Sequence, residues 1–167
     1  ALPISRGGFR NVRSKDFVPQ CINPRVQVTR GHMMAMYVVL ENYLGMICDT
    51  PQAYAGQDGF DFICTVPTTW DEIKVLEASL NEYVVIARRK GSDWYVGGIT
   101  NHVPRNITVS LDFLGNGGYD LTVWNDVKET EGEATNLDIR KGTASRADSV
   151  TLFMAGDGGA VARFEAK

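Results

Sequence analysis

Two histidines are the only imidazole groups that could serve as a general base in this chain. His32 lies near the start of a helical segment, and His102 lies in a loop between expected strands. Neither has a nucleophile and a carboxylate at a spacing that indicates a triad. The chain also lacks the GxSxG, GxxxxGK[ST], HExxH and helix-opening GxGxxG motifs. We therefore interpret both histidines as structural or surface residues.

Acidic residues form two groups that could in principle do acid–base or metal chemistry. One group gathers around the middle of the chain, where a pair could act at a glycosidic bond, and the other forms a loop nearer the C-terminus. Charged residues in loops are usually solvated, and no DxDxDG calcium loop occurs, so the sequence predicts no catalytic, cofactor-binding or metal-ligating residue. The residues concerned are Asp58, Asp61, Asp71 and Glu72 in the first group and Glu129, Glu131 and Glu133 in the second.

The three cysteines, Cys21, Cys48 and Cys64, give no sign of a disulfide framework or a zinc site. Their number is odd, and no CxxC spacing is present. We expect them to be buried free thiols, which is common for cysteine in a globular core.

Aromatic residues raise one further possibility, a platform on which sugar rings could stack. Sandwich cores also bury large aromatic side chains, and we consider core packing the stronger interpretation. The residues are Trp70, Trp94 and Trp124 together with Tyr83, Tyr95 and Tyr119.

Composition limits the class of protein. The 167 residues include 17 Lys and Arg against 20 Asp and Glu, so the net charge is −3. This balance, with only one short basic cluster at residues 88–90, argues against a nucleic-acid partner. No apolar run approaches the roughly 18 residues of a membrane span, and residues 1–10 contain no signal-peptide core. A complete (β/α)₈ barrel needs about 200 residues and is excluded.

The N-terminal part contains one strong helical segment, from about Val28 to Ile47, that ends before Pro51. Its apolar residues occupy more than one face, and such a helix must be buried on several sides. The flanking segments contain few strands that could cover it. We therefore expect material outside this chain to bury the helix.

The C-terminal part consists of short alternating runs separated by turns. Tyr83–Ile86 is a β-rich run, Lys90–Asp93 is a hairpin signal, and a period of two extends from Ile107 to Phe113. A Gly-rich turn and a strand that begins at Tyr119 come next, and weaker alternating runs follow them. The pattern predicts an antiparallel β-sandwich with one wet face on each strand.

Several stretches, taken in order, resemble the C-terminal part of glycoside hydrolase family 97. The combination of Pro-Thr-Thr-Trp-Asp-Glu at 67–72 with Ala-Arg-Arg-Lys-Gly at 87–91 is the most specific. Supporting matches are Gly-Gly-Phe-Arg-Asn-Val at 7–12, Thr-Arg-Gly-His at 29–32, Met-Tyr-Val-Val at 36–39 and Asp-Trp-Tyr-Val-Gly at 93–97. The likeness covers nearly the whole chain.

The resemblance implies an N-terminal β-sandwich, a (β/α)₈ barrel and a C-terminal antiparallel β domain in the parent protein. Residues 1–69 would then be a barrel remnant that includes the final barrel helix, and residues 70–167 would be the C-terminal domain. Family members are calcium-dependent α-glucosidases and α-galactosidases of gut Bacteroidetes and related bacteria, typically exported. Their catalytic and calcium-binding glutamates lie upstream, so no site residue and no cofactor is transferred to this chain. The missing portions of the same protein, and further copies of it, are the implied partners.

Two departures from the family pattern accompany the resemblance. Leu2–Arg6 differs from the usual run before the Gly-Phe-Arg-Asn stretch, and Tyr43–Gly45 stands where Pro-Leu-Gln is common.

Three functions remain open on the sequence. The chain is an inactive fragment of an α-glycosidase, a free-standing β-sandwich module that binds sugars or proteins, or a structural domain that supports a barrel or an oligomer.

Overall fold

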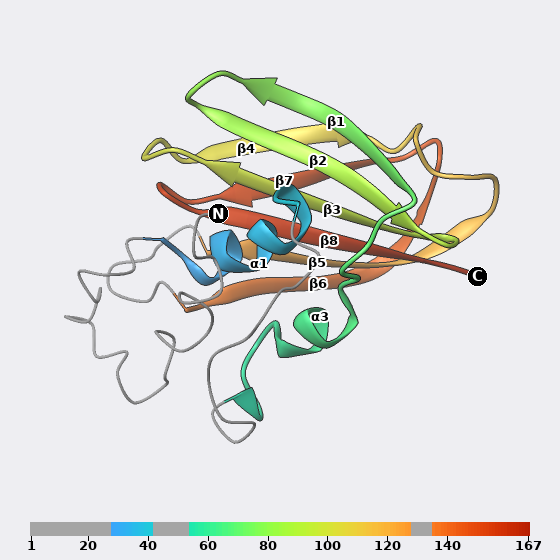
Figure 1. Ribbon diagram of the computed structural model, residues 1–167, viewed down its shortest axis with the longest axis horizontal. Coiled ribbons are helices and arrows are strands. Elements are labelled where there is room, and N and C mark those ends of the chain that lie inside the picture. Colours follow the sequence, from blue (N-terminus) through green and yellow to red (C-terminus); the bar gives the residue numbers. More distant parts are fainter. Residues whose placement is uncertain (1–27, 42–53, 128–134) are drawn as a thin grey trace.

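The computed structural model describes residues 28–41, 54–127 and 135–167, which form two helices and eight strands (Figure 1). Cys21, Cys48, the acidic loop at 129–133 and the family stretch at 7–12 lie outside these residues. The helices are α1 (Arg30–Val39) and α3 (Phe60–Thr65). The strands are β1 (Glu72–Ser79), β2 (Tyr83–Lys90), β3 (Asp93–Thr100), β4 (Arg105–Ser110), β5 (Gly118–Asp126), β6 (Leu137–Ser145), β7 (Ser149–Met154) and β8 (Gly159–Ala166).

The strands form two antiparallel sheets, as the sequence predicts. Six strands make one sheet in the order β1-β2-β3-β8-β5-β6, and β4 pairs with β7 in a second sheet. The β2–β3 hairpin closes through Gly91, whose φ of +60° fits the first central position of a two-residue type II′ turn. β4 ends at Ser110, so Leu111 and Phe113 are buried from a loop rather than from the strand that the alternation predicts.

The main core lies between the two sheets. Val96 of β3 and Phe164 of β8 meet Val109 of β4 and Leu152 of β7 in one cluster of buried residues. We call this side of the large sheet the sandwich face. A two-layer arrangement of this kind buries the apolar residues that face inward on each strand.

The opposite side of the large sheet, which we call the helix face, is covered in its centre by α1 (Figure 1). Met34, Ala35 and Val38 of α1 are fully buried there and pack with Tyr95 and Val161. The expectation of one wet face per strand is therefore wrong for β3 and β8, which are buried on both faces. The large sheet buries this face of α1, so the expectation that material outside the chain buries the helix is wrong for Met34, Ala35 and Val38.

α1 is shorter than the predicted helix. Thr29 is its N-cap and accepts a hydrogen bond from the His32 amide, with an N–O distance of 3.1 Å. The helix ends at Val39 because Leu40 adopts extended backbone, with φ −92° and ψ 144°. Residues 42–47 of the predicted helix lie outside the described part.

Two glycines allow the close approach of α1 to the sheet. A Cβ on Gly97 of β3 would lie 2.7 Å from the Val38 Cβ, and a Cβ on Gly31 would lie 2.2 Å from the Gly159 carbonyl oxygen. Backbones this close leave no room for a side chain. Among the described residues, no helix reaches the length and apolarity that a membrane span requires.

Candidate interaction surface

The central carboxylates do not assemble a catalytic pair. Asp71 accepts hydrogen bonds from Lys90 Nζ at 3.1 Å and from the Gly91 amide at 2.7 Å, and these bonds lower its pKa. Glu72, the first residue of β1, is held by Arg89 at 3.0 Å, which lowers its pKa. Both side chains therefore fasten β1 to the β2–β3 hairpin as ionised groups, and a general acid would need the opposite shift.

The remaining sequence candidates are dispersed. Asp58 is exposed in a loop and Asp61 is exposed in the first turn of α3. His102 is exposed in the β3–β4 connection. Cys64 is a free and exposed thiol on α3, so the expectation of burial is wrong for this cysteine, which lies two residues from the buried Phe62. Within the described ranges, no three His, Cys, Asp or Glu side chains gather where they could hold a metal ion.

A buried carboxylate that the sequence analysis missed lies between the start of α1 and the β7–β8 turn. Asp126, the last residue of β5, accepts hydrogen bonds through Oδ2 from the amides of Ala155 at 3.0 Å and Gly159 at 2.9 Å. Burial raises its pKa to about 6, although hydrogen bonds from Thr29 and from backbone amides oppose the rise. No local pattern marks Asp126, because its partners lie about thirty residues away along the chain or on another element.

His32 contributes to the same anchor. Its Nδ1 lies 3.1 Å from the Gly158 carbonyl oxygen, and burial lowers its pKa below the ordinary value. At the other end of α1, Arg88 donates to the Val39 carbonyl oxygen at 3.2 Å. An anionic group at the helix N-terminus and a cationic group at its C-terminus both complement the helix dipole. These residues therefore position α1 on the sheet.

The aromatic residues pack in the two cores. Trp94, Tyr119, Tyr95 and Trp124 are each at most 5% exposed, and they divide between the sandwich core and the helix-side core. Trp70 is half-buried beneath the Arg88 guanidinium, which lies 5.7 Å from the ring centroid. Tyr83 is similarly covered by Arg105 at 5.2 Å. Four of these six rings are therefore buried in a core, and the other two carry an arginine over one face.

The clearest unpartnered surface lies on the helix face at the margin formed by β1 and β2. Leu80 is 90% exposed, Val75 is 62% exposed and Ile73 is 48% exposed. We call this surface the β1–β2 patch; its members are Ile73, Val75, Ala78, Leu80, Val84, Ile86 and Ile99. Contiguous exposed apolar surface of this kind usually marks an interaction site.

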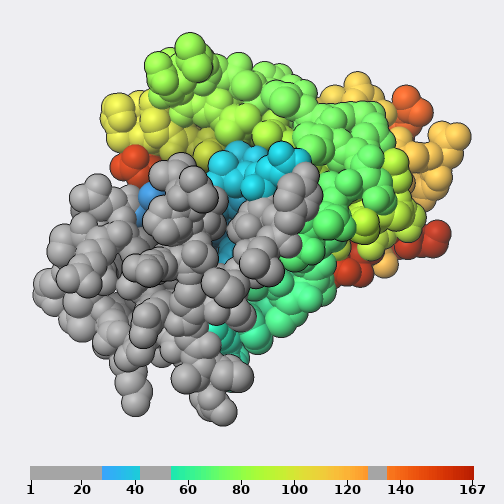
Figure 2. Space-filling model, in the orientation of Figure 1, coloured from blue at the N-terminus to red at the C-terminus, as the bar shows by residue number. Residues whose placement is uncertain are grey.

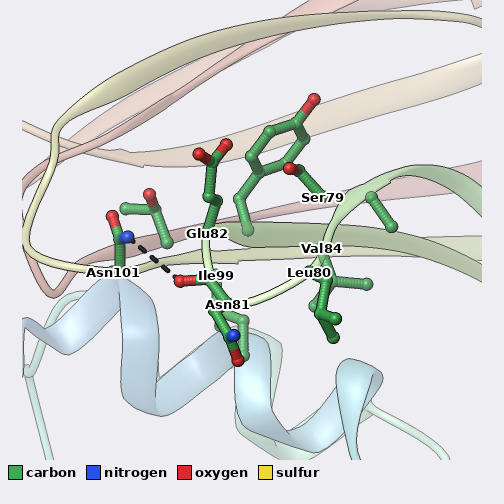
Figure 3. A pocket seen from close by; sticks show the side chains of 10 residues that line it. Ser79, Leu80, Asn81, Glu82, Val84, Ile99 and Asn101 are labelled. Atoms are coloured by element: carbon green, nitrogen blue, oxygen red, sulfur yellow. Dashed lines mark hydrogen bonds between the residues drawn. The ribbon is translucent and has the colours of Figure 1, made fainter.

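A hollow of about 520 Å³ lies at the β1–β2 turn, where the patch ends. Its lining includes four patch members and several polar residues; the patch members are Ala78, Leu80, Val84 and Ile99. Figure 3 shows Leu80 and Asn81 pointing from the turn toward the side of the sheet on which α1 lies, while Glu82 points to the other side. Figure 2 shows the β1–β2 margin uncovered at the top of the molecule, in green. The arrangement suits contact with another apolar surface rather than chemistry.

Comparison with known proteins identifies the family. The model of the glycosyl hydrolase 97 C-terminal domain, described as an oligomerisation domain, matches residues 69–165. The chain belongs to glycoside hydrolase family 97. This confirms the resemblance noted in the sequence and the antiparallel β-sandwich fold.

Relatives within glycoside hydrolase family 97 are much longer than this chain. A retaining alpha-galactosidase of Bacteroides thetaiotaomicron is 42% identical over 126 residues, which make up 75% of this chain and 19% of the relative. A solved family 97 enzyme from Pseudoalteromonas sp. strain K8, in complex with acarbose, superposes with a TM-score of 0.78 at 37% identity. That match covers 84% of this chain and 23% of the enzyme.

A more distant structure shares the fold alone. A beta-arabinopyranosidase superposes with a TM-score of 0.65 at 24% identity, over 82% of this chain and 21% of that protein. The family 97 chain described here thus corresponds to about a fifth of the relatives it matches, at their C-terminal domain.

Proposed function

We propose that this chain is the C-terminal part of an α-glycosidase, either an α-glucosidase or an α-galactosidase, and that it supports assembly without taking part in catalysis. The match of residues 69–165 to the family's oligomerisation domain carries the proposal. The alpha-galactosidase of Bacteroides thetaiotaomicron supports the substrate class. Asp71 and Glu72, the carboxylates that most nearly form a pair, are committed to ion pairs, which favours catalytic residues upstream of this segment.

We further propose that α1 is the last helix of the parent's (β/α)₈ barrel and that the domain boundary lies near residues 69 and 70. The burial of Met34, Ala35 and Val38 against the large sheet supports a role for α1 as the joint between the two domains. The family match that begins at residue 69 agrees with the boundary.

In this proposal it is the parent protein that binds calcium and is exported. The described residues contain no group suited to a metal ion, so we place the calcium ligands in the upstream barrel. We also propose that the parent acts in the periplasm or outside the cell, on α-linked glucosides or galactosides. A free-standing sugar-binding module is not favoured, because the aromatic rings are buried or covered by arginine.

The experiment compares the full-length parent protein with a version that ends before residue 70. We expect the full-length protein to hydrolyse aryl α-glucoside or α-galactoside in the presence of calcium. The shortened version should lose its oligomeric state and part of its stability, because Tyr95 and Val161 no longer cover α1. An unchanged oligomer with unchanged thermal stability would contradict the assembly role.

A further inference from the structure

We propose that the β1–β2 patch is the surface through which two copies of this chain associate. The inference rests on the proposed function, in which the C-terminal domain serves oligomerisation, and it adds the surface and the partner. The patch consists of residues from β1, β2, β3 and the β1–β2 turn, and no charged side chain is among its seven members.

The patch continues a row of residues whose centre is covered by the helices. Register places Val75, Ile86, Gly97, Val161 and Trp124 opposite one another across five strands, so all of them lie on the helix face. α1 covers the row at Gly97 and Val161, and Phe62 of α3 packs on Trp124 with ring centroids 5.3 Å apart. Val75 at the β1 end of the row is 62% exposed, and Ile139, which pairs with Trp124 at the β6 end, is 38% exposed.

The described elements that precede the sheet lie elsewhere on the same face. α1 lies mainly against β3 and β8, and its C-terminal end reaches Arg88 of β2. Tyr54 and α3 join the core on the β5–β6 side, next to Trp124 and Leu137. Among the described residues, none of these helical elements covers the β1–β2 margin, and the oligomerisation role of the family domain makes a second copy the fitting partner.

The partner must contact the face of β1 rather than its edge. β1 is an edge strand, but a bulge between Val75 and Glu77 interrupts its register. Glu72 and Lys74 form an ion pair on the strand, at 3.2 Å, and Lys74 lies over the Trp94 ring on the sandwich side. Bulges and charges of this kind prevent strand addition at an edge.

The patch is also suited to meet itself across a two-fold axis. A symmetric contact places each residue near the same surface of the partner, and an uncharged apolar patch does so without opposing like charges. The β1–β2 turn that carries Leu80 is held in place, because the Asn81 carbonyl accepts a hydrogen bond from Asn101 Nδ2 at 3.1 Å. A fixed turn loses little conformational freedom when it binds.

Sedimentation equilibrium of the 167-residue chain, from low to high micromolar concentration, tests the proposal. The test variant is Val75→Lys with Leu80→Lys. The control, Ile139→Lys with Thr143→Lys, adds the same charge at two exposed residues of β6, on the opposite margin of the large sheet. We expect the wild type and the control to dimerise. The association constant of the test variant should fall roughly a hundredfold or more, since two buried aliphatic contacts are lost.

Three outcomes would overturn the proposal: a monomeric wild-type chain, a dimer that persists in the test variant, or equal weakening in the control. Circular dichroism checks folding, and Leu80→Lys alone replaces the double variant if the latter does not fold. Radical footprinting of Leu80 gives a further test. Protection that appears only in the full-length parent, and that does not depend on concentration, would assign the patch to a contact with the upstream domain. This result would also overturn the proposal. The test does not measure glycosidase activity, so a failure of the proposed function can be told apart from a failure of this proposal.

Discussion

Trp94 is the residue on which the sandwich core depends most. Its ring packs edge-on against Phe113 with centroids 4.9 Å apart, and Phe113 in turn meets Phe164 at 6.1 Å. Only 3% of Trp94 is exposed. We expect Trp94→Ala to lower the free energy of unfolding by about 3–5 kcal/mol, measured by urea unfolding of the whole chain. Val103→Ala, at a residue that is 42% exposed and lies outside the β1–β2 patch, is the control and should shift the midpoint far less. Similar midpoints for both variants would show that Trp94 is not a core residue.

Asp126 makes stability depend on pH. Its pKa is raised by burial to about 6, so the folded state binds the proton more tightly than the unfolded chain does. The resulting stabilisation is fully present below the unfolded pKa near 4 and is lost as pH rises through about 6. The loss amounts to about 3 kcal/mol at most. Asp126→Asn should remove this dependence, as measured by urea midpoints between pH 3.5 and 7.5.

His32 contributes a pH dependence of the opposite sign. Burial lowers its pKa, so its contribution is present above the unfolded pKa and is lost as pH falls through the folded value. We therefore compare the difference in urea midpoint between wild type and Asp126→Asn at each pH, because His32 contributes equally to both proteins. A difference that does not change with pH would contradict the assignment to Asp126.

At the scale of elements, the packing of α1 on β3 depends on the absence of a side chain at Gly97. A methyl group there would lie 2.7 Å from the Val38 Cβ and 3.1 Å from the Ala35 carbonyl oxygen. We expect Gly97→Ala to destabilise the chain by about 1–3 kcal/mol, in the range of overpacked cores. Thermal or urea unfolding measures the loss.

Two matched variants make this prediction specific. Gly142 lies in β6 with open space where a Cβ would stand, so Gly142→Ala should be near neutral. Val38→Ala removes the Cγ1 atom, which would lie 3.2 Å from the new methyl group, but keeps the Cβ at 2.7 Å, so the double variant with Gly97→Ala should recover only a small part of the loss. Strictly additive effects would indicate that the two residues do not meet.

The sequence predicts the strands better than it predicts what covers them. Alternation and turn residues locate β2, β3 and β5, because period two and the Gly91 turn are local properties. The burial of both faces of β3 has no local signal, since it depends on α1 fitting over Gly97 from almost sixty residues away. Asp126 also has no local signal, because its burial depends on the β7–β8 turn and on α1.

At the scale of the whole molecule, the sheet and the helices preceding it stabilise each other. We expect residues 70–167, expressed alone, to retain antiparallel β structure but to unfold at lower urea concentration than the complete chain. Removal of α1 and α3 exposes Tyr95, Trp124 and Val161, which are now at most 3% exposed. Urea unfolding followed by circular dichroism compares the two polypeptides. Equal midpoints would show that the helices contribute nothing to the stability of the sheet.

The most direct test of a non-catalytic C-terminal part is turnover by the isolated 167-residue chain. The purified chain is incubated with aryl α-glucoside and aryl α-galactoside in the presence of calcium, beside the full-length parent. We expect the parent to release the aryl group and the chain to release none above the blank, because Asp71 and Glu72 are committed to ion pairs rather than to acid–base catalysis. Turnover by the chain that survives repurification would contradict this expectation.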